Sequence, residues 1–224
     1  MKDIQSNLDY IKSEIVSVCE KCGRNPKEIT LIGVSKTKPV SLINEAIDLG
    51  LTDIGENYVQ EVLEKIASLK PVNLHFIGHL QSNKAKQIVP HAHLIHSADS
   101  LSLLKEIDKE ARKNNKIQDI LLEIHISEEE SKFGIKPSDV PSFLDSATGF
   151  TNIKIKGLMG MAPFLPNPQD TRPYFAKLKA LFDTLPTEMR VHLSMGMTGD
   201  FREAIQEGSN MIRVGTGIFG EREY

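Results

Sequence analysis

Apolar residues in the first part of the chain recur at the spacing of a helix. They fall every three or four positions and define one apolar face, made of Ile4, Leu8, Ile11, Ile15 and Val18. Gly23 and Pro26 follow this face, and both residue types mark the end of a helix. The sequence therefore predicts an amphipathic helix ahead of the first strand.

Beyond this helix, short apolar runs alternate with segments of helical periodicity. The runs are typical of buried strands and cover residues 29–34, 53–55, 74–78, 93–96, 120–126, 155–159, 191–194 and 211–214. Helices are predicted between them, at residues 40–49, 58–69, 81–89, 100–114, 138–146, 170–185 and 200–207. Strands that alternate with helices form right-handed βαβ units with parallel strands.

Eight such units in 224 residues predict an α/β fold, a (β/α)8 TIM-type barrel with an extra N-terminal helix. An open doubly wound sheet is the main alternative, but it usually has five or six strands. Few residues follow the last strand, so we expect the N-terminal helix to cover the place of an eighth outer helix. No linker or repeat divides the sequence, which predicts a single domain over residues 1–224.

Charge and hydropathy exclude several classes of function. The chain has 27 Lys and Arg against 30 Asp and Glu, a net charge of −3, whereas nucleic-acid binding usually needs a basic patch. No apolar run approaches the roughly 20 residues of a membrane span, and the N-terminus lacks the pattern of a secretory signal. We therefore expect a cytoplasmic protein with neither a nucleic-acid nor a membrane partner.

The metal-binding residue types do not form a metal motif. Cys19 and Cys22 are a lone CxxC near a helix end, too few ligands for a zinc site, and are expected to be reduced thiols. His91, His93 and His96 lie close together in sequence but have no adjacent carboxylate. The acidic run 128–130 is typical of a solvated loop. We expect no metal site.

In a barrel of this kind, the residues that follow the strands form the active face. The last two strands are followed by SMGMTGD, from Ser194, and GTGIFG, from Gly215, which together hold five glycines. Glycine-rich backbone can close around an anion, and Ser194, Thr198 and Thr216 add hydroxyl groups. These loops predict a phosphate-bearing ligand. The rigid loop 162–168, with three prolines, is predicted to be a lid or wall of the site.

Lys36 follows the first strand in the segment SKTKP, beside the apolar Ile32 and Val34. Burial there would lower the pKa of the lysine, so that its amine could attack a carbonyl carbon. An ordinary surface lysine is the alternative. Together with a phosphate site on the same face, the lysine suits a phosphorylated aldehyde such as pyridoxal phosphate. A sugar phosphate bound without any cofactor, as in barrel aldolases, is a further alternative.

Arg213 and His79 complete the candidate site. Arg213 lies on the last strand just before Gly215 and Thr216, where alternation points it toward the same pocket. An arginine keeps its proton, so one that faces a pyridine nitrogen would leave that nitrogen unprotonated. An arginine paired with a carboxylate inside the barrel is the alternative. His79, directly after the third strand, is the best placed of the seven histidines.

Seven motifs occur in order along nearly the whole chain: SKTKP, DIGENYVQE, LHFIGHLQSNKAK, FGI, GLMGMAP, LSMGMTGDFREAI and IRVGTGIFGEREY. In them the chain resembles the pyridoxal phosphate homeostasis protein family, part of the superfamily named for the alanine racemase N-terminal barrel. The resemblance implies pyridoxal 5′-phosphate bound as an aldimine to Lys36, with Arg213 at the pyridine nitrogen. It also implies a phosphate site of Ser194, Gly215 and Thr216.

The resemblance implies further residues near the cofactor, namely Asn57, His79 and Met159. Lys38, Lys84 and Lys136 match lysines of the family outside the aldimine position, and Lys38 is a candidate for cofactor transfer. Thr198 departs from the serine that many relatives carry, but a hydroxyl is retained.

The family is described as acting in vitamin B6 and amino-acid homeostasis without established catalytic turnover. The implied partners are the cofactor and, through transient contact, apoenzymes that need it. The alternative is a small racemase-like enzyme. Racemases of this superfamily add a β-rich domain whose partner-subunit tyrosine is the second base, so here Tyr58, Tyr174 or a histidine would have to replace it. Without that domain the usual dimer contact is missing, and we expect a monomer.

Overall fold

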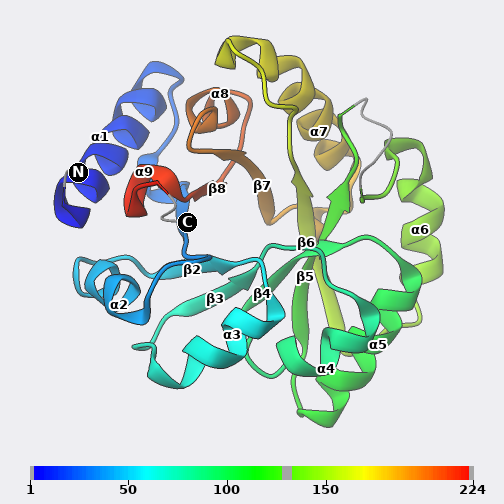
Figure 1. Ribbon diagram of the computed structural model, residues 1–224. Coiled ribbons are helices and arrows are strands. Elements are labelled where there is room, and N and C mark those ends of the chain that lie inside the picture. Colours follow the sequence, from blue (N-terminus) through cyan, green and yellow to red (C-terminus); the bar gives the residue numbers. More distant parts are fainter. Residues whose placement is uncertain (1–2, 128–132, 222–224) are drawn as a thin grey trace.

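A closed barrel of eight parallel strands forms the centre of the computed structural model, which describes residues 3–127 and 133–221. Each strand pairs with its neighbours in sequence, and β8 pairs with β1, which excludes the open doubly wound sheet. The predicted barrel is confirmed (Figure 1). The strands are β1 Thr30–Val34, β2 Asp53–Glu56, β3 Asn73–Phe76, β4 Leu94–Ala98, β5 Gln118–Ile124, β6 Ile153–Gly160, β7 His192–Met197 and β8 Met211–Val214.

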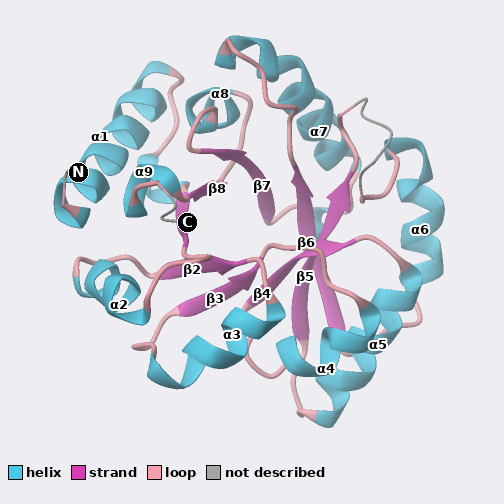
Figure 2. Ribbon diagram, viewed as in Figure 1, coloured by secondary structure: helices cyan, strands magenta, loops and turns pink. Residues whose placement is uncertain are grey.

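Helices surround the barrel (Figure 2). In the described residues they are α1 Ile4–Lys21, α2 Val40–Asp48, α3 Val59–Lys65, α4 Ala85–Ile88, α5 Leu101–Lys113, α6 Val140–Ala147, α7 Arg172–Thr184, α8 Phe201–Gln206 and α9 Thr216–Phe219. All seven helices predicted between strands are present, most of them shorter than expected. Four of the predicted helices are partly 3-10, because Ile66–Ser68 extends α3 and 3-10 turns precede α4, α6 and α7 at Ser82–Lys84, Pro137–Asp139 and Pro168–Thr171.

The predicted role of the N-terminal helix is confirmed. In the described residues only the four-residue α9 follows β8, and α1 packs against both α8 and α9 on one side and α2 on the other (Figure 1). The five apolar positions that define its face are all buried. Asn7 Nδ2 also donates to the Ile218 carbonyl at 2.9 Å, which ties α1 to α9.

Side chains alternate in direction along each strand. One set packs under the helices as an outer core, and the other set points into the barrel. The inside contains its own apolar cluster, formed by Ile32, Leu94, Leu121, Met159 and Met211. Buried polar residues, including His75, His96 and Arg213, share the interior with this cluster. Because the interior is filled with side chains, a ligand has to bind at one end of the barrel.

The remaining sequence motifs have plain structural positions. Cys19 is buried in the last turn of α1 and Cys22 caps its C-terminus, and both are free thiols. Within residues 3–127 and 133–221, no group of three or more metal-ligating side chains comes together, and no helix is long and apolar enough to cross a membrane. The acidic run 128–130 lies outside the described residues.

Candidate functional site

The turn that carries Lys36 is held in an unusual backbone conformation. Lys36 is half-buried, and the Lys38 N–H closes the turn by donating to the Ser35 carbonyl at 3.1 Å. Thr37 has φ 64°, a left-handed conformation that is strained for a β-branched residue. The carboxylate of Glu61, on α3, accepts the Thr37 N–H at 2.7 Å. The outer helix thus fixes the residue that follows Lys36.

A buried ion cluster lies directly under this turn. Lys65 Nζ donates to the Ser35 carbonyl at 3.0 Å and to Glu56 Oε1 at 2.9 Å, and it also pairs with Glu61. The Ser35 hydroxyl donates to the same Glu56 oxygen at 2.7 Å. Burial raises the pKa of Glu56, although Lys65 and Ser35 oppose the shift. These contacts join β1, β2 and α3 below Lys36, and the sequence motifs gave no sign of them.

Asn57 and His79 follow β2 and β3 at the same end of the barrel. The Asn57 Oδ1 atom is buried and has no hydrogen-bond partner in the described structure. Only glycine fits at Gly78, because a Cβ there would lie 2.1 Å from the Asn57 carbonyl oxygen. The His79 ring stacks on Phe133 with centroids 3.7 Å apart, and its Nδ1 lies 3.6 Å from Asp99 Oδ2. Both predicted residues are therefore at the mouth of the barrel.

The glycine loops after β7 and β8 meet at one hydroxyl group. Thr198 Oγ1 accepts hydrogen bonds from the Gly215 N–H at 3.3 Å and the Gly217 N–H at 3.4 Å. Gly196 has φ 94°, and a Cβ there would lie 2.5 Å from Ala204 Cβ, so no larger residue fits. The loops thus direct two backbone donors at a single oxygen atom, which is the arrangement that an anion requires.

The structure places Ser194 away from these loops. Ser194 is fully buried within β7, and its hydroxyl contacts Arg213 Nη1 at 2.6 Å and His96 Nδ1 at 3.1 Å. Thr198, four residues further along, is the residue whose side chain bonds to the Gly215 and Gly217 loop. The other predicted residue of the loop, Thr216, is exposed at the start of α9.

Arg213 lies on β8 inside the barrel, as alternation predicts, and is 4% exposed. Its guanidinium donates to the Ser194 hydroxyl and, through Nη2 at 3.2 Å, to the Gly160 carbonyl. Burial lowers its pKa to about 10, with Asp200 and Glu123 opposing the shift from a distance. No carboxylate in the described ranges forms an ion pair with it, so the predicted alternative of a direct Arg–carboxylate pair is wrong.

The Ser194 contact is part of a longer chain of buried side chains, which we term the interior chain: Asp53, His75, His96, Ser194 and Arg213. Asp53 Oδ1 lies 2.8 Å from His75 Nε2, and His75 Nδ1 lies 3.0 Å from His96 Nε2. The sequence places these histidines in the core but does not indicate that they contact each other.

Burial shifts the pKa values along the interior chain. It lowers the pKa of His75, against the opposing effect of Asp53, and it lowers the pKa of His96 far below its usual value. Burial would raise the pKa of Asp53, but hydrogen bonds from His75, Thr52 and Asn73 outweigh it and the pKa is lowered. Neutral imidazoles next to an ionised carboxylate follow from these directions.

A hollow of about 360 Å³ opens at the mouth beside the loops after β5, β6 and β7. Its wall includes Glu123, Phe133, Met161, Phe164 and Met197. Met159, another predicted site residue, is buried at the register position next to both Glu123 and Ser194. The loop 162–168 contributes Ala162 and Phe164 to this hollow and lines a second one of about 290 Å³.

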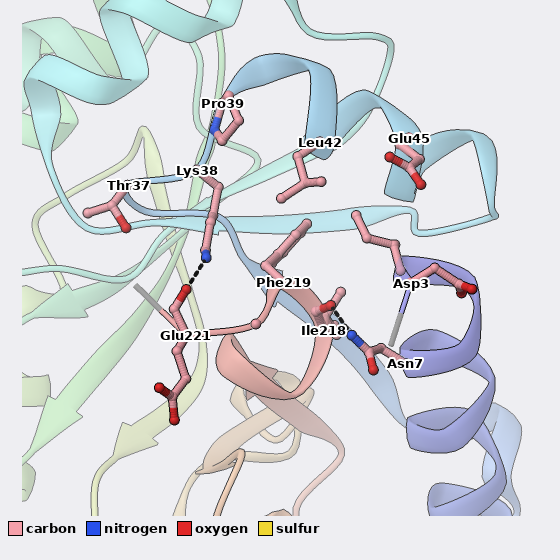
Figure 3. A pocket seen from close by; sticks show the side chains of 12 residues that line it. Asp3, Asn7, Thr37, Lys38, Pro39, Leu42, Glu45, Ile218, Phe219 and Glu221 are labelled. Atoms are coloured by element: carbon pink, nitrogen blue, oxygen red, sulfur yellow. Dashed lines mark hydrogen bonds between the residues drawn. The ribbon is translucent and has the colours of Figure 1, made fainter. Parts of the chain in front are cut away.

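Another hollow, of about 400 Å³, lies outside the rim between α1, α2 and α9. Figure 3 shows Thr37 and Lys38 at its edge, with Lys38 Nζ donating to the Glu221 carbonyl at 2.7 Å. Lys36 does not line this hollow. The two other matched lysines are exposed, Lys84 at the end of the 3-10 turn before α4 and Lys136 just before the 3-10 turn that leads into α6.

Comparison with known proteins gives full-length relatives. The family model described as "Alanine racemase, N-terminal domain" matches residues 6–223. A pyridoxal phosphate homeostasis protein of Aquifex aeolicus is 45% identical over 222 residues, with 97% of each chain covered. A protein of the same name from Escherichia coli K12 is 36% identical and covers 100% of this chain and 99% of its own.

Solved structures show the same barrel. PipY of Synechococcus elongatus, solved with PLP bound, is 32% identical with a TM-score of 0.83, and 97% of this chain and 100% of that chain are covered. An alanine racemase of Clostridium difficile is 12% identical with a TM-score of 0.73, and the match covers 99% of this chain but 57% of the racemase. At that identity the racemase likeness concerns the fold alone.

Glu123 is expected to make the free energy of unfolding depend on pH. Burial, with a contribution from Asp99, raises its pKa to about 7. Between its ordinary value of 4.5 and about 7, the folded protein holds a proton that the unfolded chain has released, so stability falls as the pH rises through this window. We expect Glu123→Gln to match the wild type near pH 4.5 and to exceed its free energy of unfolding at pH 8 by on the order of 3 kcal/mol.

Urea unfolding of the ligand-free protein at both pH values measures this difference. Glu188→Gln, at an exposed position, is the control and should follow the wild type at each pH. A Glu123→Gln variant that is no more stable than the wild type at pH 8 would contradict the assigned titration.

Proposed function

Because the chain belongs to the alanine racemase N-terminal domain family, we propose that it binds pyridoxal 5′-phosphate at the mouth of its barrel and acts in vitamin B6 and amino-acid homeostasis. The full-length relatives carry that homeostasis name, and PipY was solved with the cofactor. We further propose a cytoplasmic monomer with one domain, residues 1–224. Transient contact with apoenzymes would let it supply the cofactor.

The observation that carries this proposal is the adjacency of the lysine turn and the glycine loop. β1 and β8 pair in register, with Gly33 opposite Val214. At the ends of these strands, a Cβ on Gly215 would lie 3.4 Å from Val34 Cβ, so Gly215 follows closely beside the strand that leads to Lys36. An amine and an anion-binding backbone on neighbouring strand ends suit one small molecule that carries both an aldehyde and a phosphate.

The residues at the mouth fit the chemical groups of the cofactor. Lys36 would supply the amine for a covalent link to its aldehyde. The Gly215 and Gly217 N–H groups, the Thr198 hydroxyl and Thr216 would hold the phosphate, and in this role Thr198 replaces the predicted Ser194. Arg213 would face the pyridine nitrogen, and Asn57, His79 and Met159 would surround the ring. The buried Asn57 Oδ1 is an acceptor that has no partner in the described structure.

We propose that the protein does not turn over amino acids. The cofactor's chemistry is to stabilise negative charge on a bound amino acid, and it does so best with a protonated pyridine nitrogen. Arg213 remains a cation at neutral pH, since its pKa is about 10. It can donate a hydrogen bond to that nitrogen but does not transfer a proton to it. Two-base racemisation also needs an acid/base opposite Lys36. Of the two tyrosines considered for that role, Tyr58 is 52% exposed at the start of α3, and Tyr174 lies on the outer helix α7.

Substitution of the lysine tests the covalent link. Lys36→Ala is expected to abolish the visible absorbance that the wild type gains with pyridoxal phosphate, because no amine remains at that position. Borohydride reduction and peptide mass mapping should place the adduct on Lys36 in the wild type. Lys38→Ala, on the same turn, is the matched control and should keep the absorbance. Retained absorbance in Lys36→Ala and an adduct on Lys38 would show that the assignment is wrong.

Substitution of the threonine tests the phosphate site. Thr198→Ala removes a hydroxyl that would donate to a charged phosphate, worth about 1.5 kcal/mol or more, so the dissociation constant should rise about tenfold. Thr198→Ser keeps the hydroxyl and should bind like the wild type. Equilibrium titration of the absorbance measures both. Equal affinity in Thr198→Ala and the wild type would remove Thr198 from the phosphate site.

Hydrogen exchange tests the absence of turnover. L-Alanine incubated in D2O with the cofactor-loaded protein should exchange its α-hydrogen no faster than with the same concentration of free pyridoxal phosphate, as measured by proton NMR. An exchange rate that rises in proportion to protein concentration, and disappears in Lys36→Ala, would instead establish the racemase-like alternative.

A further inference from the structure

Arg213 is held from inside the barrel by residues that do not reach the mouth. We propose that Asp53, His75, His96 and Ser194 are positioning residues for Arg213, joined in a hydrogen-bond chain in which every donor points from the guanidinium toward Asp53. The direction of the chain follows from the described contacts alone. Its effect on the cofactor rests on the proposed function, in which Arg213 faces the pyridine nitrogen.

The two ends of the interior chain fix its direction. Arg213 has only N–H donors, so the Ser194 hydroxyl accepts from Nη1 at 2.6 Å. At the other end the ionised Asp53 can only accept, so His75 carries its proton on Nε2, which is 2.8 Å away. Thr52 Oγ1 and Asn73 Nδ2 also donate to this carboxylate, at 2.6 Å and 3.1 Å, which favours its ionised form.

The middle of the chain then has one arrangement of protons. A neutral His75 has a bare Nδ1, which must accept from His96 Nε2 at 3.0 Å. His96 in turn has a bare Nδ1, which accepts the Ser194 hydroxyl proton at 3.1 Å. All contacts between the five residues are satisfied in this arrangement. Both histidines are the Nε2–H tautomer.

The rival arrangement places a second proton on His75. His75 would then donate to His96 and reverse the outer half of the chain, leaving Asp53 and His75 as a buried ion pair. Burial opposes that extra charge, because His75 is 1% exposed and His96 is fully buried. Arg213 already supplies one positive charge to the same interior, which further disfavours a second. The neutral chain is therefore the arrangement that the surroundings support.

Two acceptors restrict the guanidinium, one at each terminal nitrogen, and the interior chain supplies the first. Ser194 holds Nη1, and the Gly160 carbonyl holds Nη2 at 3.2 Å. Both acceptors are themselves fixed, Ser194 by the histidines and Gly160 by the β5–β6 ladder. Loss of the Ser194 hydroxyl would leave one of these two contacts and a buried guanidinium free to turn. A looser arginine would retain a bound ring less well.

Nitrogen-15 NMR of the full-length protein, labelled at histidine, tests the direction of the chain without any variant. Long-range proton–nitrogen correlations at neutral pH should show His75 and His96 as Nε2–H tautomers, before and after addition of pyridoxal phosphate. A doubly protonated His75, or an Nδ1–H proton on either ring, would overturn the proposed chain.

Release of the cofactor tests the positioning role. Ser194→Ala should speed the release of pyridoxal phosphate to a scavenging apoenzyme about tenfold and should shift the His96 Nδ1 resonance. Ser97→Ala is the matched control, because Ser97 is equally buried on β4 and its hydroxyl has no partner in the described structure. Thermal unfolding of both variants distinguishes a general loss of stability from a specific effect on cofactor release.

The possible results separate the two proposals. Release from Ser194→Ala at the wild-type rate would overturn the positioning role even where NMR supports the chain. Failure of the wild type to take up pyridoxal phosphate would overturn the proposed function and, with it, the role toward the cofactor, while the NMR result would still decide the direction of the chain.

Discussion

Pairing between β1 and β8 is the contact on which the site depends. A parallel barrel closes only when its first and last strands form a ladder, and here that ladder runs from Thr30 opposite Met211 to Gly33 opposite Val214. Closure brings together two strand ends that are about 180 residues apart in sequence, one leading to Lys36 and the other to Gly215. The amine of Lys36 and the glycine loop become neighbours because the sheet has no edge.

Closure also creates an interior that has to be filled. Apolar side chains fill part of it, and the interior chain with Arg213 takes up another part. A buried arginine whose pKa falls to about 10 costs on the order of 3 kcal/mol of stability relative to an exposed one. The hydrogen bonds to Ser194 and Gly160 offset this cost, and they do so with polar groups that are already fixed by the strands. The hydrogen bonds that stabilise the buried charge also fix the orientation of the guanidinium.

The sequence predicts those features that depend on local order. Hydrophobic periodicity is sufficient for the eight strands, for α1 and for Lys36 at a strand end, because each depends on residues close in sequence. Alternation alone places Arg213 inside the barrel. The strained turn at Thr37 is different, since it depends on Glu61, a residue of the following helix, which no local pattern links to it.

The parts of the site that the sequence does not predict depend on contacts between residues far apart in sequence. His75 and His96 touch because their strands pair, and Ser194 reaches His96 across 98 positions of sequence, so neither contact has a local signature. The sequence predicts Ser194 at the phosphate, whereas in the structure the Ser194 hydroxyl contacts Arg213 and His96. The register between β7 and β8 shifts between Ser194 and Met197, and the strand continues to Met197. The hydroxyl that reaches the glycine loop is consequently that of Thr198.

The position of α1 has a consequence for the order in which the protein folds. This helix precedes all eight strands, but its partners α8 and α9 follow β7 and β8, and the hydrogen bond from Asn7 to Ile218 spans 211 positions. Early in folding α1 can pack against α2 alone, and its contacts with α8 and α9 form only when the C-terminal part of the chain is present. Such distant contacts slow folding and leave a nascent chain with exposed hydrophobic surface. The outer layer of helices is thus completed by a segment that precedes every strand of the barrel.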